Sequence, residues 1–323
     1  MKKILSFVLA AAMLLGLTSC GSGGSGSAAA GKKYVVGICQ AQKHDALDAA
    51  TEGFKKALKE KLGDQVEFDE QVAAGEQNAC STIVNSFVSK KVDLILANAT
   101  PALQAAAAAT TTIPILGTAV TEYGVALDLK DFNGTVGGNI SGTSDLAPLD
   151  QQADMVLEFV PTAKKVGLLY CSAEPNSLYQ VQKVKEALEK KGLECKEFPF
   201  SEANDLSAVV TAAADYSDAI YIPTDNTAAS STGIIDGVCR PKKIPVIAGE
   251  EGICKGCGVA TLSISYEQLG YKTGLMAAKI LTGESKIAEM PIEYDEKVQK
   301  KYNKTICDDL GIQVPDGYEA IAQ

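Results

Sequence analysis

The stretch Asp218-Ala219-Ile220-Tyr221-Ile222-Pro223-Thr224-Asp225-Asn226 joins a short apolar run to an abrupt polar end. The same arrangement occurs earlier, at Asp93-Leu94-Ile95-Leu96-Ala97-Asn98-Ala99-Thr100-Pro101. A short apolar run that stops at turn-forming residues is typical of a buried strand. In an open α/β sheet, ligands bind just beyond the carboxyl ends of such strands. One strand end of this kind in each half of the chain predicts two lobes that face one ligand.

The two halves of the chain repeat one order of elements. The first half predicts strands at 33–40, 66–72, 93–97 and 113–120 and helices at 45–62, at 76–90 and after Pro101. A joining helix at 146–160 leads to strands at 164–171, 193–198, 218–226 and 244–251 and helices at 178–191 and 205–214. Alternating strands and helices indicate parallel sheets covered on both faces. We therefore expect an α/β fold of two similar doubly wound parallel-sheet lobes joined by a hinge.

The last part of the chain does not continue this repeat. A strand at 259–264 and a long helix at 266–281 precede a polar tail that starts at Pro291. The extra elements predict that the chain crosses back to complete the first lobe, and three crossing segments form a hinge that permits closure. The expected lobes are 33–143 with about 263–290, and 144–262 with about 291–323.

The first 32 residues are predicted to lie outside the fold. Two lysines precede an apolar run over 4–17 that is too short to span a bilayer comfortably, and Leu17-Thr18-Ser19-Cys20 follows it. Residues 1–20 resemble a bacterial lipoprotein signal that is cleaved before a lipidated Cys20. An uncleaved anchor and an ordinary secretion signal are the alternatives. Residues 21–32 are mostly Gly, Ser and Ala and predict a flexible tether, so we expect a protein anchored to the membrane outside the cytoplasm.

Composition and cysteine use exclude several classes of protein. A formal net charge of −10 argues against a nucleic-acid surface, which needs a basic face. The cysteines after Cys20 are scattered through apolar positions, as buried small side chains are, and Cys254-Lys-Gly-Cys257 in a Gly-rich loop predicts a local disulfide or free thiols. With one histidine in the chain, a structural zinc site is not expected. No nucleotide or metalloprotease motif occurs, and we predict neither a cofactor nor a metal.

Several short segments, spread over most of the chain after the tether, together point to one family. They are Gly37-Ile38-Cys39-Gln40, 44–48, 99–104, 137–145, 174–177, 223–226 and 265–270. These segments resemble the type I solute-binding lipoproteins of ABC transporters, and more narrowly the tryptophan- and tyrosine-type substrate-binding proteins. The chain departs from that pattern at Ala41, where an aromatic residue is common, and at Thr121-Glu122-Tyr123, where Asp-Pro is usual.

The resemblance implies a function in transport. Two lobes are expected to close on a small amino acid-like ligand, aromatic in type, and to deliver it to a membrane permease driven by a cytoplasmic ATPase. We expect a monomer and no enzymatic activity. A ligand sensor or adhesion lipoprotein on the same fold is one alternative. A secreted α/β enzyme using Asp225, Glu174 and His44 is another, although no catalytic motif supports it.

The polar residues at the predicted strand ends suit a zwitterion. We predict that Asp225 pairs with the ligand's ammonium group, with capping of the next helix by Asp225 or Asn226 as the alternative. Glu174, Asn176 and Ser177 precede a helix whose amino end, with Ser177, is expected to hold a carboxylate, with ordinary turn and cap chemistry as the alternative. The other predicted ligand-binding residues are Gln40, His44, Thr100, Gln104, Thr118, Asn226 and Asp145, the last of which is equally suited to a hinge hydrogen bond.

Overall fold

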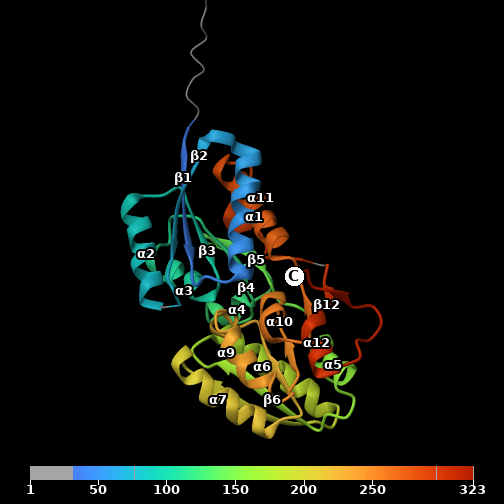
Figure 1. Cartoon of the computed structure of the whole chain (residues 1–323). Coiled ribbons are helices and arrows are strands. Elements are labelled where there is room, and N and C mark those ends of the chain that lie inside the picture. The colour runs from blue at the N-terminus through green and yellow to red at the C-terminus, as the bar shows by residue number, and fades with distance from the viewer. Residues whose placement is uncertain (1–31, 76, 296, 323) are drawn as a thin grey trace, which may run out of the picture. The chain divides into compact units, whose positions relative to one another are not determined.

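The computed structural model describes residues 32–75, 77–295 and 297–322 (Figure 1). The predicted signal, most of the predicted tether and Cys20 lie outside the described residues. In the described part of the chain, no helix is long and apolar enough to cross a membrane.

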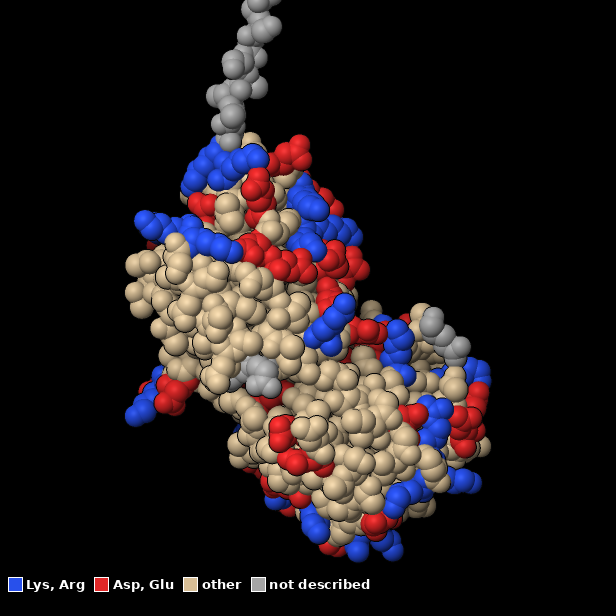
Figure 2. Space-filling view, turned by 60° about the vertical axis from the view of Figure 1, so that its left-hand side comes forward, with Lys and Arg blue, Asp and Glu red and all other residues tan. Residues whose placement is uncertain are grey.

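The first lobe is built on a parallel sheet with the strand order β11-β5-β4-β3-β1-β2. Its strands are β1 (Tyr34–Gln40), β2 (Val66–Val72), β3 (Leu94–Asn98), β4 (Ile115–Val120), β5 (Ile140–Ser144) and β11 (Glu293–Tyr294). Helices α1 (Asp45–Leu62) and α11 (Tyr266–Leu281) pack together on one face, and α2 (Gln77–Lys90) and α3 (Thr100–Ala109) cover the other (Figure 1). A broad surface of this lobe lacks charged side chains in Figure 2, in agreement with the sequences of α2 and α3, where Lys90 is the single charged residue.

The second lobe is built on a sheet with the strand order β13-β12-β10-β9-β8-β6-β7. Its strands are β6 (Lys165–Cys171), β7 (Glu194–Phe200), β8 (Ala219–Ile222), β9 (Val246–Ala248), β10 (Ala260–Ser263), β12 (Gln299–Tyr302) and β13 (Glu319–Ala320). Its helices are α5 (Leu149–Phe159), α6 (Pro175–Lys190), α7 (Ala203–Tyr216), α8 (Asn226–Ala229), α9 (Thr232–Cys239), α10 (Glu251–Cys257) and α12 (Lys304–Leu310). The strands pair in parallel except for β12, which is antiparallel to β10. The first lobe also contains three short helices, which are α4 (Tyr123–Ala126), Gly63–Gln65 and Ile287–Glu289.

The two sheets confirm the predicted fold and the repeat. The order β2-β1-β3-β4-β5 in one sheet corresponds to β7-β6-β8-β9-β10 in the other. Each lobe is therefore the same doubly wound unit, and the carboxyl ends of its central strands form one polar rim. The core of each unit consists of apolar strand residues under the covering helices.

Three parts of the chain differ from the sequence-based expectations. β5 was not predicted, because Gly142, Thr143 and Ser144 break the apolar pattern. Gly142 lies so close to β4 that an added Cβ would be 2.1 Å from the Gly117 oxygen. This strand therefore needs a residue without a side chain at position 142, and the bulky residues that usually indicate a strand would not fit there. The polar segment after Pro291 is not a tail but contributes β11, β12, α12 and β13. The Cys254-x-x-Cys257 pair lies in helix α10 rather than in a loop.

The connections between the sheets lie after β5, after β10 and after β11 in the described residues. β11 pairs with β5, so residues 293–294 belong to the sheet of the first lobe and the third connection follows Tyr294. The second connection leads into α11, which lies against α1 so closely that a Cβ on Gly270 would be 1.9 Å from the Ala50 oxygen. This glycine contact fixes the returning helix to the first lobe.

Candidate functional site

A cavity of about 440 Å³ lies between the carboxyl ends of the central strands of the two lobes. The first lobe contributes Ala41, Gln42, Ala74, Gly75, Cys80 and Pro101, and the second contributes Cys171, Ala173, Glu174, Ser201, Glu202, Ala203, Asn204, Asn226 and Thr227. None of these described lining residues is Lys or Arg, whereas Glu174 and Glu202 carry carboxylates. The cavity therefore favours a positively charged group in its ligand and disfavours an anion.

A short loop of the first lobe bridges to the second lobe beside this cavity. The Gln42 side-chain amide donates to the Ser230 hydroxyl, and His44 Nε2 lies 3.2 Å from Asn226 Oδ1. One residue further on, Asp45 Oδ2 lies 3.1 Å from Lys255 Nζ. These contacts join loop 42–45 to α8 and α10, so the described structure is a closed arrangement of the lobes.

Glu174 is the most extensively bonded side chain of the site. Its Oε2 accepts from the Asn226 amide nitrogen at 3.0 Å, from Asn226 Nδ2 at 2.6 Å and from Asn176 Nδ2 at 3.3 Å. Its Oε1 accepts from the nitrogen and the hydroxyl of Thr227 at 2.9 and 2.8 Å. The carboxylate is buried, and it ties the loop before α6 to the first turn of α8.

Asp225 is the N-cap residue of helix α8 and is completely buried. Its carboxylate accepts from the Ala228 nitrogen at 2.8 Å, which is the N-cap bond, and from the Cys171 nitrogen at 2.6 Å. Burial, and next the nearby charge of Glu174, raise the pKa of Asp225 to about 7. Two neighbouring buried carboxyl groups without a Lys or Arg partner in the described structure leave negative charge that a ligand cation would neutralise.

The rim of the first lobe is strained but uncharged. Ala74 and Ala99 follow the ends of β2 and β3, and Ala119 is the last residue but one of β4; their φ angles are 54°, 86° and 52°. A left-handed conformation costs about 1 kcal/mol or more for a residue with a Cβ, and such strain gathers at functional sites. Ala99 directs the chain into α3, whose first residue is the buried Thr100 and whose cap provides no side-chain hydrogen bond.

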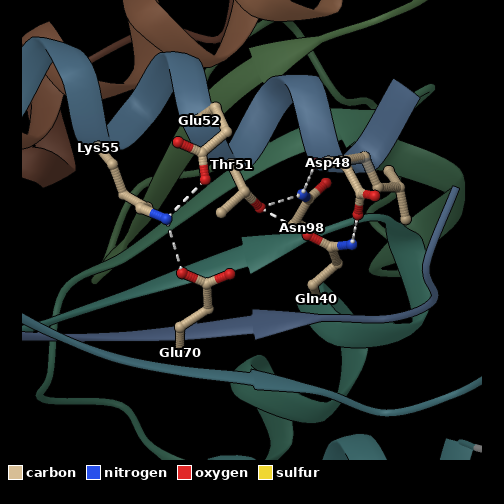
Figure 3. Close-up of polar contacts among 8 residues, drawn as sticks. Gln40, Asp48, Thr51, Glu52, Lys55, Glu70 and Asn98 are labelled. Carbon is tan, nitrogen blue, oxygen red and sulfur yellow. Dashed lines mark hydrogen bonds and ion pairs between the residues drawn. The ribbon is translucent and has the colours of Figure 1, made fainter. Parts of the chain in front are cut away.

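Gln40 is held within the first lobe rather than in the cavity lining. Its amide donates to Asp48 Oδ1 at 2.6 Å and accepts from the Thr51 hydroxyl at 2.7 Å (Figure 3). Asn98 Nδ2 donates to the same hydroxyl at 2.9 Å and to the Leu47 oxygen at 2.8 Å. These bonds fasten α1 to the ends of β1 and β3, and they position the loop that bridges the lobes.

Four other predicted residues make contacts away from the lining. Gln104 Nε2 donates to the Ala126 oxygen at 3.0 Å, and the Thr118 hydroxyl lies 3.2 Å from that of Thr143. Asp145 Oδ2 accepts from the Tyr266 hydroxyl at 2.9 Å, and the Ser177 hydroxyl lies 3.5 Å from the Thr224 oxygen. The contact of Asp145 joins two of the connections between the lobes, which is the hinge role considered from sequence.

The structure thus brings part of the predicted set together. Glu174 and Asn226 line the cavity, and His44 and Asn176 contact them. Sequence reasoning missed the segment 201–204 and the small residues Ala74, Gly75 and Cys80. Segment 201–204 could have been predicted, because it follows the end of β7, which corresponds in the second lobe to β2 in the first. The small residues have no polar signature, and only the packed structure shows that they form a wall.

The cysteines of α10 are free thiols in this structure. Cys254 and Cys257 are buried, and that burial raises the pKa of each well above its ordinary value. Within the described residues, no group of three or more His, Cys, Asp or Glu side chains is placed to hold a metal ion.

The comparisons with known proteins identify the family. Residues 35–323 match the model of the ABC transporter substrate binding proteins, and the chain belongs to this family. A curated relative is the tyrosine-binding protein of Clostridioides difficile strain R20291, which is 35% identical over 323 residues that cover 97% of this chain and 93% of the relative. Substrate-binding proteins of ABC transporters work outside the cytoplasm, and this chain is a solute-binding protein rather than an enzyme.

Two solved structures are similar over 90% of this chain. One is the ABC domain from Streptococcus pneumonia in complex with L-Trp, with a TM-score of 0.85, 31% identity and all of that chain covered. The other is the ligand-free, open structure of a substrate-binding protein with adhesive properties from Clostridium difficile, with a TM-score of 0.68, 37% identity and 99% of that chain covered. Although the second is closer in sequence, the first is closer in structure. The lower TM-score against the open structure agrees with the contacts that loop 42–45 makes between the lobes, because a different arrangement of the lobes lowers the TM-score.

Proposed function

We propose that this chain is the extracytoplasmic receptor of an ABC importer for an aromatic amino acid of the tryptophan or tyrosine type. Its lobes close on the ligand and present it to a membrane permease driven by a cytoplasmic ATPase. The receptor acts as a monomer and is anchored through a lipid on Cys20. The observation that carries the proposal is a cavity between two facing strand rims with carboxylates on one side and no cationic side chain among its described lining residues.

The charges of the cavity orient a zwitterion. The ammonium group lies toward the second lobe, where Glu174 and Asp225 are buried as neighbours. The ligand carboxylate lies toward the amino end of α3, beside Thr100, where helix N–H groups and the helix dipole favour an anion. A carboxylate at the start of α6 with Ser177, the arrangement favoured from sequence, would meet the charge of Glu174.

The wall of the first lobe leaves space for a ring. Ala41, Ala74, Gly75 and Pro101 are small or compact, and Ala41 stands where the resembling family commonly has an aromatic residue. A cavity of about 440 Å³ is within the range of small-ligand sites, which is roughly 300–1,000 Å³. The aromatic ring of the ligand fills the space that these small side chains leave open.

The proposal is tested by equilibrium titration of the mature protein. The chain contains no Trp, so fluorescence excited in bound L-tryptophan comes from the ligand alone. L-tryptophan, L-tyrosine and L-phenylalanine are titrated together with sugars and nucleosides as comparison compounds. We expect binding of at least one aromatic amino acid without turnover. Binding of sugars or nucleosides only, or chemical conversion of the amino acid, would overturn the proposed function.

A further inference from the structure

Two buried cysteines of the first lobe lie together at the wall of the cavity between the lobes. Cys39 is the last residue but one of β1, and Cys80 lies in the first turn of α2. Their exposed fractions are 0% and 1%, and both belong to the same apolar core. Cys80 also lines the cavity. A small molecule that enters the cavity therefore reaches the Cys80 side of this pair.

The packing of α2 on β1 brings the two thiols together. An added Cβ on Gly37 would be 2.6 Å from the Phe87 ring, so Phe87 covers the face of β1 on which Gly37 lies. Side chains alternate along a strand, so Cys39 lies on that same face. Cys80 precedes Phe87 by about two helical turns and shares its face of α2. Because α2 runs back from the carboxyl ends of the strands, Cys80 lies over Cys39, and the Cys39 thiol donates a hydrogen bond to it.

The Cys-x-x-Cys pair of α10 is arranged differently. Cys254 Sγ lies 3.8 Å from the Gly258 oxygen, and Cys257 Sγ lies 3.4 Å from the Ile253 oxygen. Each of these thiols is thus directed at a backbone carbonyl. The thiols of Cys39 and Cys80 are instead directed at one another, which is the arrangement that a disulfide needs.

The surroundings of the pair make Cys80 the attacking thiol. The hydrogen bond from Cys39 lowers the pKa of Cys80, whereas the same bond, and next burial, raise the pKa of Cys39. Cys80 also lies in the first turn of a 14-residue helix, whose N–H groups favour a thiolate. The thiolate is the nucleophile in thiol–disulfide exchange. Cys80 is therefore the more acidic sulfur of the pair as well as the one that borders the cavity.

We propose that Cys39 and Cys80 are a redox-active pair that forms a disulfide in the wall of the cavity, with a small extracytoplasmic disulfide as the oxidant. Proteins of this family work outside the cytoplasm, where disulfides form and persist. The inference goes beyond the proposed function, because the reaction of the pair does not depend on which solute the protein binds.

The reaction consists of two exchange steps. The Cys80 thiolate attacks one sulfur of the small disulfide, whose S–S bond breaks and releases one small thiol. The Cys39 sulfur then attacks the Cys80 sulfur, and the second small thiol leaves. Two protein thiols are oxidised to one disulfide, one small disulfide is reduced to two thiols, and the two cysteine protons end on the released thiols.

The backbone beside the pair is already held in place. The Ala73 nitrogen donates to the Gln40 oxygen at 2.9 Å, and the Gly75 nitrogen donates to the Ala41 oxygen at 2.9 Å. These two bonds join the segment after β2 to the end of β1. A disulfide between Cys39 and Cys80 adds the start of α2 to the same part of the cavity wall.

Peptide mapping tests the disulfide in the wild-type protein. The full-length chain is incubated with oxidised glutathione, denatured with N-ethylmaleimide in the absence of reductant, digested with trypsin and analysed by mass spectrometry. Lysines lie between Cys39 and Cys80, so trypsin places the two residues in separate peptides. We expect these two peptides to be joined by a disulfide. N-ethylmaleimide on both cysteines, or a bond from Cys80 to the cavity-lining Cys171 of the second lobe, would overturn the proposal.

Single substitutions test the order of the two steps. After the same treatment, Cys39→Ser should retain one glutathione on Cys80, because the thiol that resolves the mixed disulfide is missing. Cys80→Ser should leave Cys39 without glutathione. Cys254→Ser is the matched control, since it removes a buried thiol of the other lobe and should leave the Cys39–Cys80 bond intact. Glutathione on Cys39 in Cys80→Ser and none on Cys80 in Cys39→Ser would overturn the assignment of the attacking thiol.

The mapping of the wild-type protein decides the disulfide even if the variants fold poorly. It is also independent of the ligand titration. Failure to bind aromatic amino acids would overturn the proposed function and leave the mapping unaffected, whereas unlinked Cys39 and Cys80 would overturn this inference alone.

Discussion

Replacement of Glu174 by Gln tests whether the second lobe's rim is organised by one carboxylate. The substitution keeps the shape of the side chain and removes its charge. Glu174 accepts bonds from both sides, two at Oε1 from Thr227 and three at Oε2 from Asn226 and Asn176. A Gln amide has one oxygen, so whichever end becomes the nitrogen faces at least two donors that have no acceptor.

The expected loss of stability follows from those donors. A buried donor left without an acceptor costs about 1–3 kcal/mol. Two such donors, partly relieved by rearrangement, give a decrease of about 2–4 kcal/mol in the free energy of unfolding. For a protein of this size, that decrease corresponds to a fall of roughly 5–10 °C in the melting temperature. The same substitution removes the charge closest to the proposed ammonium position, so affinity for L-tryptophan should fall about 10-fold or more.

Glu202→Gln is the matched control. Glu202 lines the same cavity from the same lobe, but its exposed side chain makes no cap hydrogen bond at the start of α7. Thermal unfolding without ligand and fluorescence titration with L-tryptophan are measured for both variants. Glu202→Gln should change the melting temperature by about 1 °C or less. Equal melting temperatures and affinities for the two variants would refute the role of Glu174 as the carboxylate that organises the rim.

Three further predictions concern packing, protonation and anchoring. Gly270→Ala should lower the free energy of unfolding by about 1–3 kcal/mol, because the added Cβ would meet the backbone of α1. Gly237→Ala in α9 is the control: a Cβ there meets nothing within 4 Å, so the free energy of unfolding should stay the same or rise by up to about 1 kcal/mol. Urea denaturation measures both variants. Burial raises the pKa of Asp225 and of Glu250 to about 7, so the folded protein retains protons that the unfolded chain releases above pH of about 4. The free energy of unfolding of the ligand-free protein should therefore fall between pH 5 and 7 and level off above pH 7. The lowered pKa of His44 acts in the opposite direction, but it belongs to one group against two. A steady rise in the free energy of unfolding over that range would contradict the burial of both acids. Cys20→Ser should release the protein from the membrane fraction and abolish incorporation of a labelled fatty acid, and unchanged labelling would place the anchor elsewhere.

The sequence predicted the strand ends better than the roles of the residues on them. Asp225 and Asn226 were correctly placed after a buried strand, because an apolar run followed by a polar cluster is a local pattern. The same pattern cannot distinguish a ligand contact from a helix cap, since both use a carboxylate at the start of a helix. In the structure the Asp225 carboxylate makes the cap bond to Ala228 and reaches the Cys171 nitrogen, a contact across 54 positions of sequence.

What the sequence by itself determined is the doubled α/β unit and its family, because alternation of strands and helices and the order of short motifs are properties of neighbouring residues. Only the tertiary structure decided which polar groups are already satisfied and which await a partner. The Gln40 amide is saturated by Asp48, Thr51 and the Gln42 oxygen, whereas His44 Nδ1 is buried without a partner. The physical reason is that hydrogen-bond satisfaction depends on side chains brought together from distant segments, and no local pattern encodes that outcome.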